Sequence, residues 1–156
     1  MPYTTFHEKF PIIAEKETRV MTAINVPELP KGNYILLESY CDEVGCDCRR
    51  VFFNIFSERR MEFVAVIAYG WENPEFYAKW FGDDDPLFIK ELKGPSLNLA
   101  SPQSELAPIL LDKIMYVLKD EYYIERIKKH YRMFKDLIEK ENKKKGRNNE
   151  YRKRKG

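Results

Sequence analysis

Apolar residues never form a long run in this chain of 156 residues. Because a helix needs about 20 consecutive apolar residues to cross a bilayer, the sequence predicts no membrane span. The first residues, Met1 to Thr5, also lack the basic start and apolar stretch of a signal peptide. We therefore expect a cytoplasmic protein in a reducing setting.

Several catalytic patterns are absent as well. The sequence has no Gly-rich phosphate loop, no Gly-x-Ser-x-Gly motif and no paired histidines on one helix. Histidine itself is scarce, since only His7 and His130 are present. These absences favour a non-enzymatic protein. A metal-dependent hydrolase or a redox-active thiol protein is the alternative.

Cysteine is scarce but concentrated. All three cysteines, Cys41, Cys46 and Cys48, fall within eight consecutive residues in the spacing Cys-x4-Cys-x-Cys. Zinc takes thiolate and imidazole ligands in a tetrahedron, and a short loop can bring three thiolates to one point. A disulfide would leave an odd cysteine, and three free or redox-active thiols are a further alternative. The spacing predicts a zinc site that these three cysteines share.

A tetrahedral site needs a fourth donor, and the sequence offers several. His130 is the preferred one, because it lies on the apolar stripe of the last predicted helix and a helix holds a ligand rigidly. His7, in a short N-terminal arm, is the alternative, and Asp42, Asp47 or a water can also bind zinc. A structural site fills all four positions with protein, whereas a catalytic site leaves one for water. We expect a structural zinc.

The flanks of the cysteines suggest a hairpin. If Cys41 faces Cys48 across it, both thiols lie on the same side of the sheet. Gly45 can supply a positive φ for the turn. Arg49 and Arg50 follow directly and would offset the negative charge of the thiolates and lower the pKa of Cys41.

The stretch Tyr-Cys-Asp-x3-Cys-Asp-Cys-Arg-Arg-Val, from Tyr40 to Val51, resembles an uncharacterised prokaryotic family in which this motif lies between two strands. Some members of that family are joined to a C-terminal SEC-C-type zinc motif, which is absent here because no cysteine follows Cys48. The similarity reaches to about Glu139. It also includes the stretches Phe6 to Phe10, Ser101 to Ser104, and His130-Tyr131. The resemblance implies a metal-binding domain of unknown role.

Alternating and β-branched residues predict an α+β fold with an antiparallel four-stranded meander. The predicted strands are Thr18 to Val26, Tyr34 to Tyr40, Arg50 to Ser57 and Met61 to Tyr69. The expected register sets Tyr34 opposite Ile55 and places Phe63 on the same face as both. Both faces are apolar, so both should be covered. Helices would cover one face, and the N-terminal arm or a second subunit in a homodimer would cover the other.

Helices are expected mainly after the sheet. A short helix or arm interrupted at Pro11 comes first, and residues 86–100 are expected to be mostly irregular. The predicted later helices are a short one from Glu75 to Phe81 capped by Asn73, one beginning at Ser101, and one from Glu121 to about Lys140. The last two should pack as a pair on one face of the sheet.

Charge divides the chain. Residues 140–156 hold nine Lys or Arg and two acidic residues, a net +7, so the remaining residues carry −5 of the total +2. We therefore expect one zinc-binding domain over 1–139 and a disordered basic tail over 140–156. Such a tail binds nucleic acid or a ribonucleoprotein through its phosphates. A purely solubilising tail is the alternative.

Overall fold

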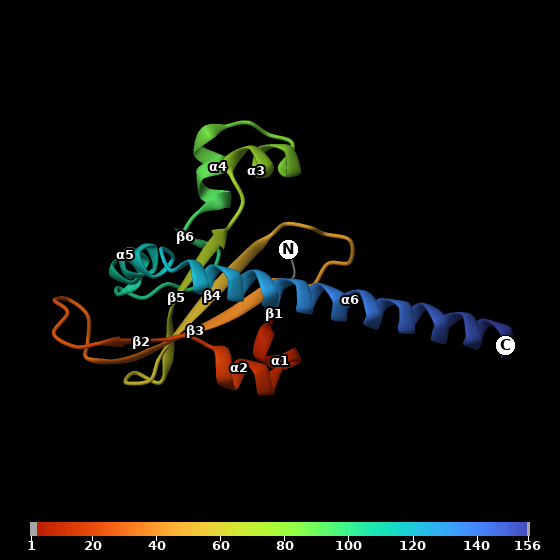
Figure 1. Ribbon diagram of the computed structural model, residues 1–156, viewed down its shortest axis with the longest axis horizontal. Coiled ribbons are helices and arrows are strands. Elements are labelled where there is room, and N and C mark those ends of the chain that lie inside the picture. Colours follow the sequence, from red (N-terminus) through yellow and green to blue (C-terminus); the bar gives the residue numbers. More distant parts are fainter. Residues whose placement is uncertain (1–2, 156) are drawn as a thin grey trace.

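The computed structural model describes residues 3–155, and its centre is a six-stranded antiparallel sheet (Figure 1). The strands are β1 (Tyr3–Thr5), β2 (Val20–Ala23), β3 (Gly32–Cys41), β4 (Arg50–Ser57), β5 (Glu62–Gly70) and β6 (Ser96–Leu97). The helices are α1 (Phe6–Lys9), α2 (Pro11–Glu17), α3 (Pro74–Phe81), α4 (Pro86–Lys93), α5 (Ala107–Val117) and α6 (Glu121–Lys155). The α+β class is confirmed. The four-stranded meander is wrong, because β1 and β6 extend the sheet to six strands.

β3 organises the sheet, because three strands pair with it. β4 occupies one of its edges, while β2 and β1 share the other edge one after the other. β2 pairs with the first half of β3, and β1 pairs with the second half, where Tyr3 lies opposite Cys41. The chain segment before β2 therefore ends up beside the cysteine end of the sheet.

The register of β3 and β4 differs from the prediction by two residues. Tyr34 lies opposite Ser57, not Ile55, because β4 begins only at Arg50 and Cys48 stays in the loop. A shift of two residues keeps every side chain on its predicted face, since side chains alternate with a period of two. Phe63 is the exception. A bulge at Ile55/Phe56 pairs it with Phe56, and Phe63 is exposed.

α6 crosses one face of the sheet (Figure 1). The ring of Tyr123 stacks with that of Phe53 at 6.2 Å between centroids, and Phe134 lies 5.8 Å from Tyr40. On the opposite face, Tyr3 stacks on Phe52 at 4.1 Å. Ile35, Leu37 and Phe56 on that second face are only half-buried. A homodimer through this face stays a prediction.

Two helix boundaries were predicted wrongly, and one helix was missed. α5 begins at Ala107 and not at Ser101, because the preceding loop bonds to β5 instead. The Gln103 side-chain amide accepts from the Val66 N–H at 3.0 Å and donates to its carbonyl at 2.9 Å, as a neighbouring strand would. α4 occupies part of the stretch expected to be irregular, with the Asp85 carboxylate capping it at Leu87 N.

The second boundary is the end of α6, which continues past Lys140 to Lys155 as one helix. Its end projects beyond the sheet as a free rod (Figure 1). A break at residues 118–120 separates α5 from α6, and the Asp120 carboxylate accepts from Tyr122 N at 3.0 Å. None of the described helices combines the length and the apolar composition that crossing a bilayer requires.

Candidate metal centre

The three cysteines lie at the end of β3 and in the loop that connects β3 to β4. Cys41 is the last residue of β3, and the loop that follows turns back at Gly45, whose φ is +79°. Within this turn the Cys46 N–H donates to the Glu43 carbonyl at 3.3 Å. The fold of the loop brings the two later cysteines back to the first.

Arg49 makes the next turn, directly after Cys48, with a positive φ of 49°. A left-handed arginine is uncommon, and two tyrosines hold its backbone in place. The Arg49 N–H donates to the Tyr131 hydroxyl of α6 at 3.2 Å, and the Tyr77 hydroxyl of α3 donates to the Arg49 carbonyl at 2.8 Å. The loop is thus fixed to two helices before it enters β4.

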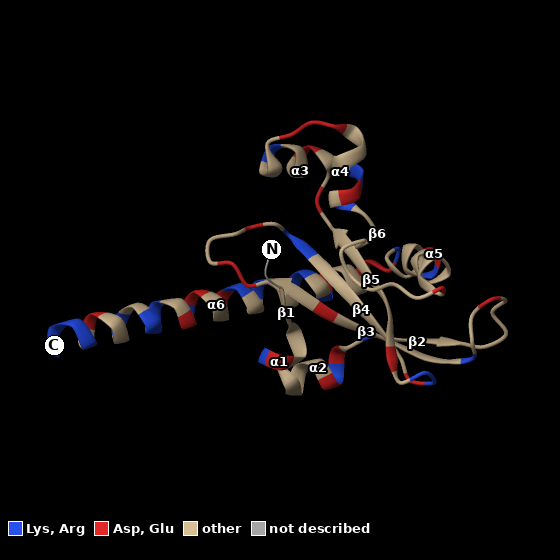
Figure 2. Ribbon diagram, turned by 180° about the vertical axis from the view of Figure 1, so that it is seen from behind, with Lys and Arg blue, Asp and Glu red and all other residues tan. Residues whose placement is uncertain are grey.

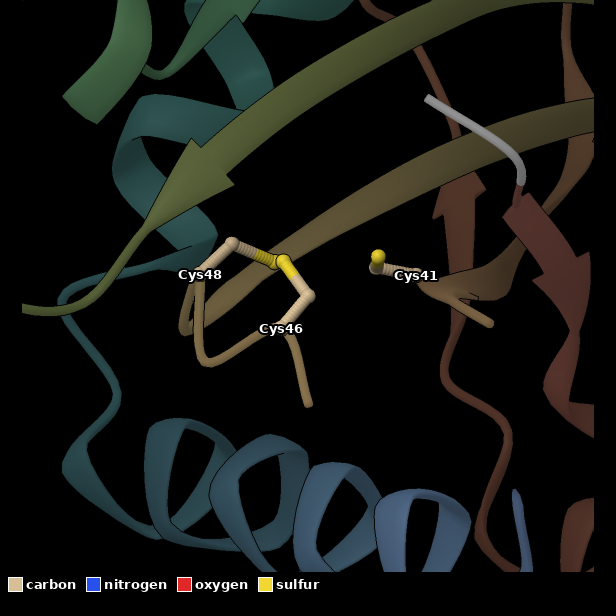
Figure 3. A group of neighbouring side chains, drawn as sticks. All are labelled: Cys41, Cys46 and Cys48. Atoms are coloured by element: carbon tan, nitrogen blue, oxygen red, sulfur yellow. The ribbon is translucent and has the colours of Figure 1, made fainter. Parts of the chain in front are cut away.

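The sulfur atoms of Cys41, Cys46 and Cys48 all lie within 4.8 Å of one another. Figure 3 shows Cys41 extending from the sheet toward Cys46 and Cys48, which come from the loop. All three are free thiols, so the disulfide alternative finds no support. Cys41 and Cys48 are fully buried, whereas Cys46 is half-buried. A group of three cysteines at this spacing can hold a metal ion.

The pKa values of the three thiols shift in different directions. A hydrogen bond from Cys48 lowers the pKa of Cys41 to about 5, against the opposing effect of burial. The same bond raises the pKa of Cys48, and burial raises the pKa of Cys46. Cys41 is therefore the thiol of the three that loses its proton most readily in the absence of metal.

The cation that acts on these sulfurs comes from α6. The Lys135 ammonium contributes to lowering the pKa of Cys41, and its Nζ lies 3.4 Å from the Glu43 carbonyl oxygen. Arg49, predicted for this role, instead pairs with Asp47 at 2.9 Å and Glu72 at 3.4 Å. The sequence could not point to Lys135, because it is distant in the chain and resembles many other helix lysines.

The aspartates of the loop have other partners. The bonds from Arg49 lower the pKa of Asp47, which also accepts from the Tyr131 hydroxyl at 3.0 Å. Asp42 accepts from the Thr4 hydroxyl of β1 at 2.6 Å. Neither carboxylate joins the sulfur group at the range that unites the three cysteines.

His130 does not join the cysteines either. Its Nδ1 lies 2.8 Å from the Glu38 carboxylate and its Nε2 lies 2.5 Å from the Glu17 carboxylate. The ring is fully buried and stacks on Phe6 at 4.2 Å. Both nitrogens are occupied, so the proposal of His130 as fourth ligand finds no support in this arrangement.

His7, the other proposed ligand, is exposed on α1 and belongs to no metal-binding group among residues 3–155. What lies beside the cysteines is a pocket of about 260 Å³. Cys46, Glu43, Tyr131 and Lys135 are among its lining residues. The cysteine cluster is therefore accessible to solvent at Cys46, its half-buried member.

Comparison with known proteins adds no assignment. No family model matches the chain, and no curated protein or solved structure matches it either. The resemblance to the uncharacterised prokaryotic family therefore stays a prediction.

Proposed function

We propose that the chain is a small zinc-binding module whose metal is structural. The observation that carries this proposal is the mutual approach of three cysteine sulfurs within 4.8 Å. Thiolates are the ligands that favour zinc over hard cations such as Mg²⁺. Cys41, Cys46 and Cys48 would supply three ligands, and a water or a donor outside the described residues would complete the tetrahedron.

The place of the cluster favours a structural role. Two of the three cysteines are fully buried and belong to the hydrophobic core. A metal held by them would tie the end of β3 to the loop that Tyr131 and Tyr77 connect to α6 and α3. A hydrolytic centre also needs a base, and the loop carboxylate of Asp47 is already paired with Arg49 at 2.9 Å, so that reading has less support.

A redox-active thiol is the second candidate, and the lowered pKa of Cys41 favours it. In that chemistry a peroxide oxidises the Cys41 thiolate to a sulfenic acid, and the peroxide is reduced to water. The thiol of Cys46 or Cys48 then attacks the sulfenic sulfur, which forms a disulfide and releases a second water.

The test is metal analysis of protein purified under reducing conditions without a metal-binding tag. We expect about one zinc per chain. At pH 7, titrating zinc into the metal-free protein should release about two protons, since Cys46 and Cys48 must lose theirs to bind. A folded protein that takes up no zinc but forms a disulfide with peroxide would establish the redox role instead.

We further propose that the basic end of α6 binds nucleic acid without sequence specificity. The supporting observation is that Asn142 to Lys155 are exposed along the whole segment, which keeps its cations available to phosphates (Figure 2). The test compares the full chain with a chain ending at Glu141, a cut that retains the Lys9–Glu141 ion pair. Equal binding by both forms at low salt would leave this end a solubilising segment.

A further inference from the structure

The free end of α6 has two different sides. It projects beyond the last ion pair to the body, Lys9–Glu141 at 3.2 Å, and runs to Lys155. A helix turns by about 100° and rises about 1.5 Å per residue, so residues 140–155 form a rod about 24 Å long. The positions of its charges around this rod follow from that geometry.

Most of the cations gather on one side. Within about 60° of the direction of Lys140, helical geometry places six Lys or Arg residues and no acidic residue. These cations, here called the basic stripe, are Lys140, Lys143, Lys144, Arg147, Arg154 and Lys155. The two acidic residues, Glu141 and Glu150, fall outside it. Tyr151 is the one other residue within the stripe, and its ring is exposed.

The stripe is itself divided into two flanks and a centre. Lys143 and Arg154 lie toward one flank, and Lys144 and Lys155 lie toward the other. Tyr151 lies between the flanks. A groove of a nucleic-acid duplex is bordered by a phosphate backbone on each side. This distribution of charge fits such a groove, because each flank of the stripe then faces one backbone.

We infer that the free end of α6 binds double-helical DNA by lying in the major groove with the basic stripe inward. The major groove of B-form DNA is about 12 Å wide and admits a helix about 10–12 Å across. The major groove of A-form RNA is deep and narrow and excludes it. This inference rests on the proposed nucleic-acid binding and narrows it to one class of partner.

The rest of the molecule is arranged to allow this contact. The other 139 residues carry a net −5, which repels phosphates, and the rod holds the stripe away from them (Figure 2). No described residue packs on the side chains after Glu141 closely enough to bury them. The stripe therefore reaches a duplex without rearrangement of the sheet or of the cysteine loop.

The experiment compares two triple variants with the same loss of charge. The stripe variant carries Lys144→Gln, Arg147→Gln and Lys155→Gln. The control variant, changed on the opposite side, carries Lys145→Gln, Arg152→Gln and Lys153→Gln. Each loses two lysines and one arginine from exposed positions, so both should keep the melting temperature of the full chain. The probes are a 20-base-pair DNA duplex of mixed sequence, the matching RNA duplex and a single strand.

We expect the stripe variant to bind the DNA duplex at least about tenfold more weakly at 0.1 M salt, with a salt dependence reduced by up to about 2.7 logarithmic units per decade. The control variant should lose less than about threefold, because its cations face away from the groove. The full chain should prefer the DNA duplex over both other probes.

A second pair of variants changes the helix and leaves the charge alone. Gly146 lies within the rod, and glycine is a poor helix former. A side chain added at this position would meet no other atom within 4 Å. Gly146→Ala should strengthen DNA binding, and Gly146→Pro should weaken it. A tail that binds as a flexible chain would show the same affinity in both.

The outcomes separate the two proposals. If the full chain binds none of the probes at low salt, the proposed nucleic-acid binding fails, and this inference fails with it. If the full chain binds but the stripe and control variants lose affinity equally, only the one-sided helix is wrong. Equal or better binding of the RNA duplex or the single strand would overturn the DNA groove.

Discussion

The cysteine loop and the free end of α6 are opposites in how they are held. In the loop, the single residue Arg49 has three partners: Tyr131 at its N–H, Tyr77 at its carbonyl and Asp47 at its side chain. Along α6, every side chain from Asn142 to Lys155 is exposed. One region is irregular backbone fixed by tertiary contacts, and the other is regular backbone whose side chains are all exposed. Regular secondary structure is therefore no guide to where this molecule is stable.

The strongest way to sharpen this contrast is to remove one thiolate from the loop. If zinc is structural, its binding energy is part of the folding energy, so Cys48→Ser should lower the melting temperature by more than about 10 °C. A strong chelator should do the same to the unchanged protein and should add nothing to the variant. A variant as stable as the parent would show that the cluster does not hold the fold.

The second test compares two aromatic residues of α6 itself. Phe134 is fully buried against Tyr40, whereas Tyr151 is exposed at the free end. Phe134→Ala should cost about 3–5 kcal/mol of unfolding free energy, and Tyr151→Ala should cost almost nothing. Urea denaturation measures both. Similar losses would mean that the free end is held as firmly as the packed end.

The packed part of α6 also carries a pH signature at His130. Burial alone would lower its pKa, but the bonds to Glu38 and Glu17 outweigh burial and raise it above 6.5. Lys129 lies 4.0 Å from Glu17, and the Tyr40 hydroxyl donates to Glu38. A raised pKa stabilises the fold fully below about pH 6.5, and this stability is lost as the pH rises through the folded value.

We therefore expect the melting temperature of the parent protein to fall relative to that of His130→Gln between pH 6 and pH 9, because the contributions of the cysteines are common to both proteins. Thermal melts across this range measure the difference. Parallel curves would mean that His130 is neutral in the folded protein at pH 6.

The smallest effect should come from deleting the free end. A chain that stops at Glu141 should unfold with a free energy within about 0.5 kcal/mol of the full chain, because only exposed side chains are lost. A larger loss would show that residues 142–155 stabilise the body.

Most elements of this fold could be predicted wherever a local sequence pattern indicates them. The strands β3, β4 and β5 were predicted nearly to the residue, and α3 was predicted with its Asn73 cap, which accepts from Phe76 N at 2.9 Å. β1 and β6, at three and two residues, are too short to show a period. The start of α5 was misplaced because Gln103 pairs with β5 through its side chain, which no backbone propensity records.

The same holds for the candidate metal site, of which only the part that is local in sequence could be predicted. The three cysteines lie in one loop, so their spacing alone indicated that they meet. The role of His130 could not be deduced, because its partners Glu38 and Glu17 lie 92 and 113 positions away in the chain. A buried histidine on an apolar stripe looks the same in sequence whether it binds a metal or two carboxylates.

The pairing of Tyr3 with Cys41 has a practical consequence for handling the protein. An N-terminal polyhistidine tag joins the chain near Tyr3, so its imidazoles would come within reach of the three sulfurs and would compete as ligands for any metal bound there. A tag after Lys155 begins at the far end of α6, about 20 Å or more beyond Glu141. Purification through a cleavable C-terminal tag, removed before any binding assay, keeps both regions as the native chain has them.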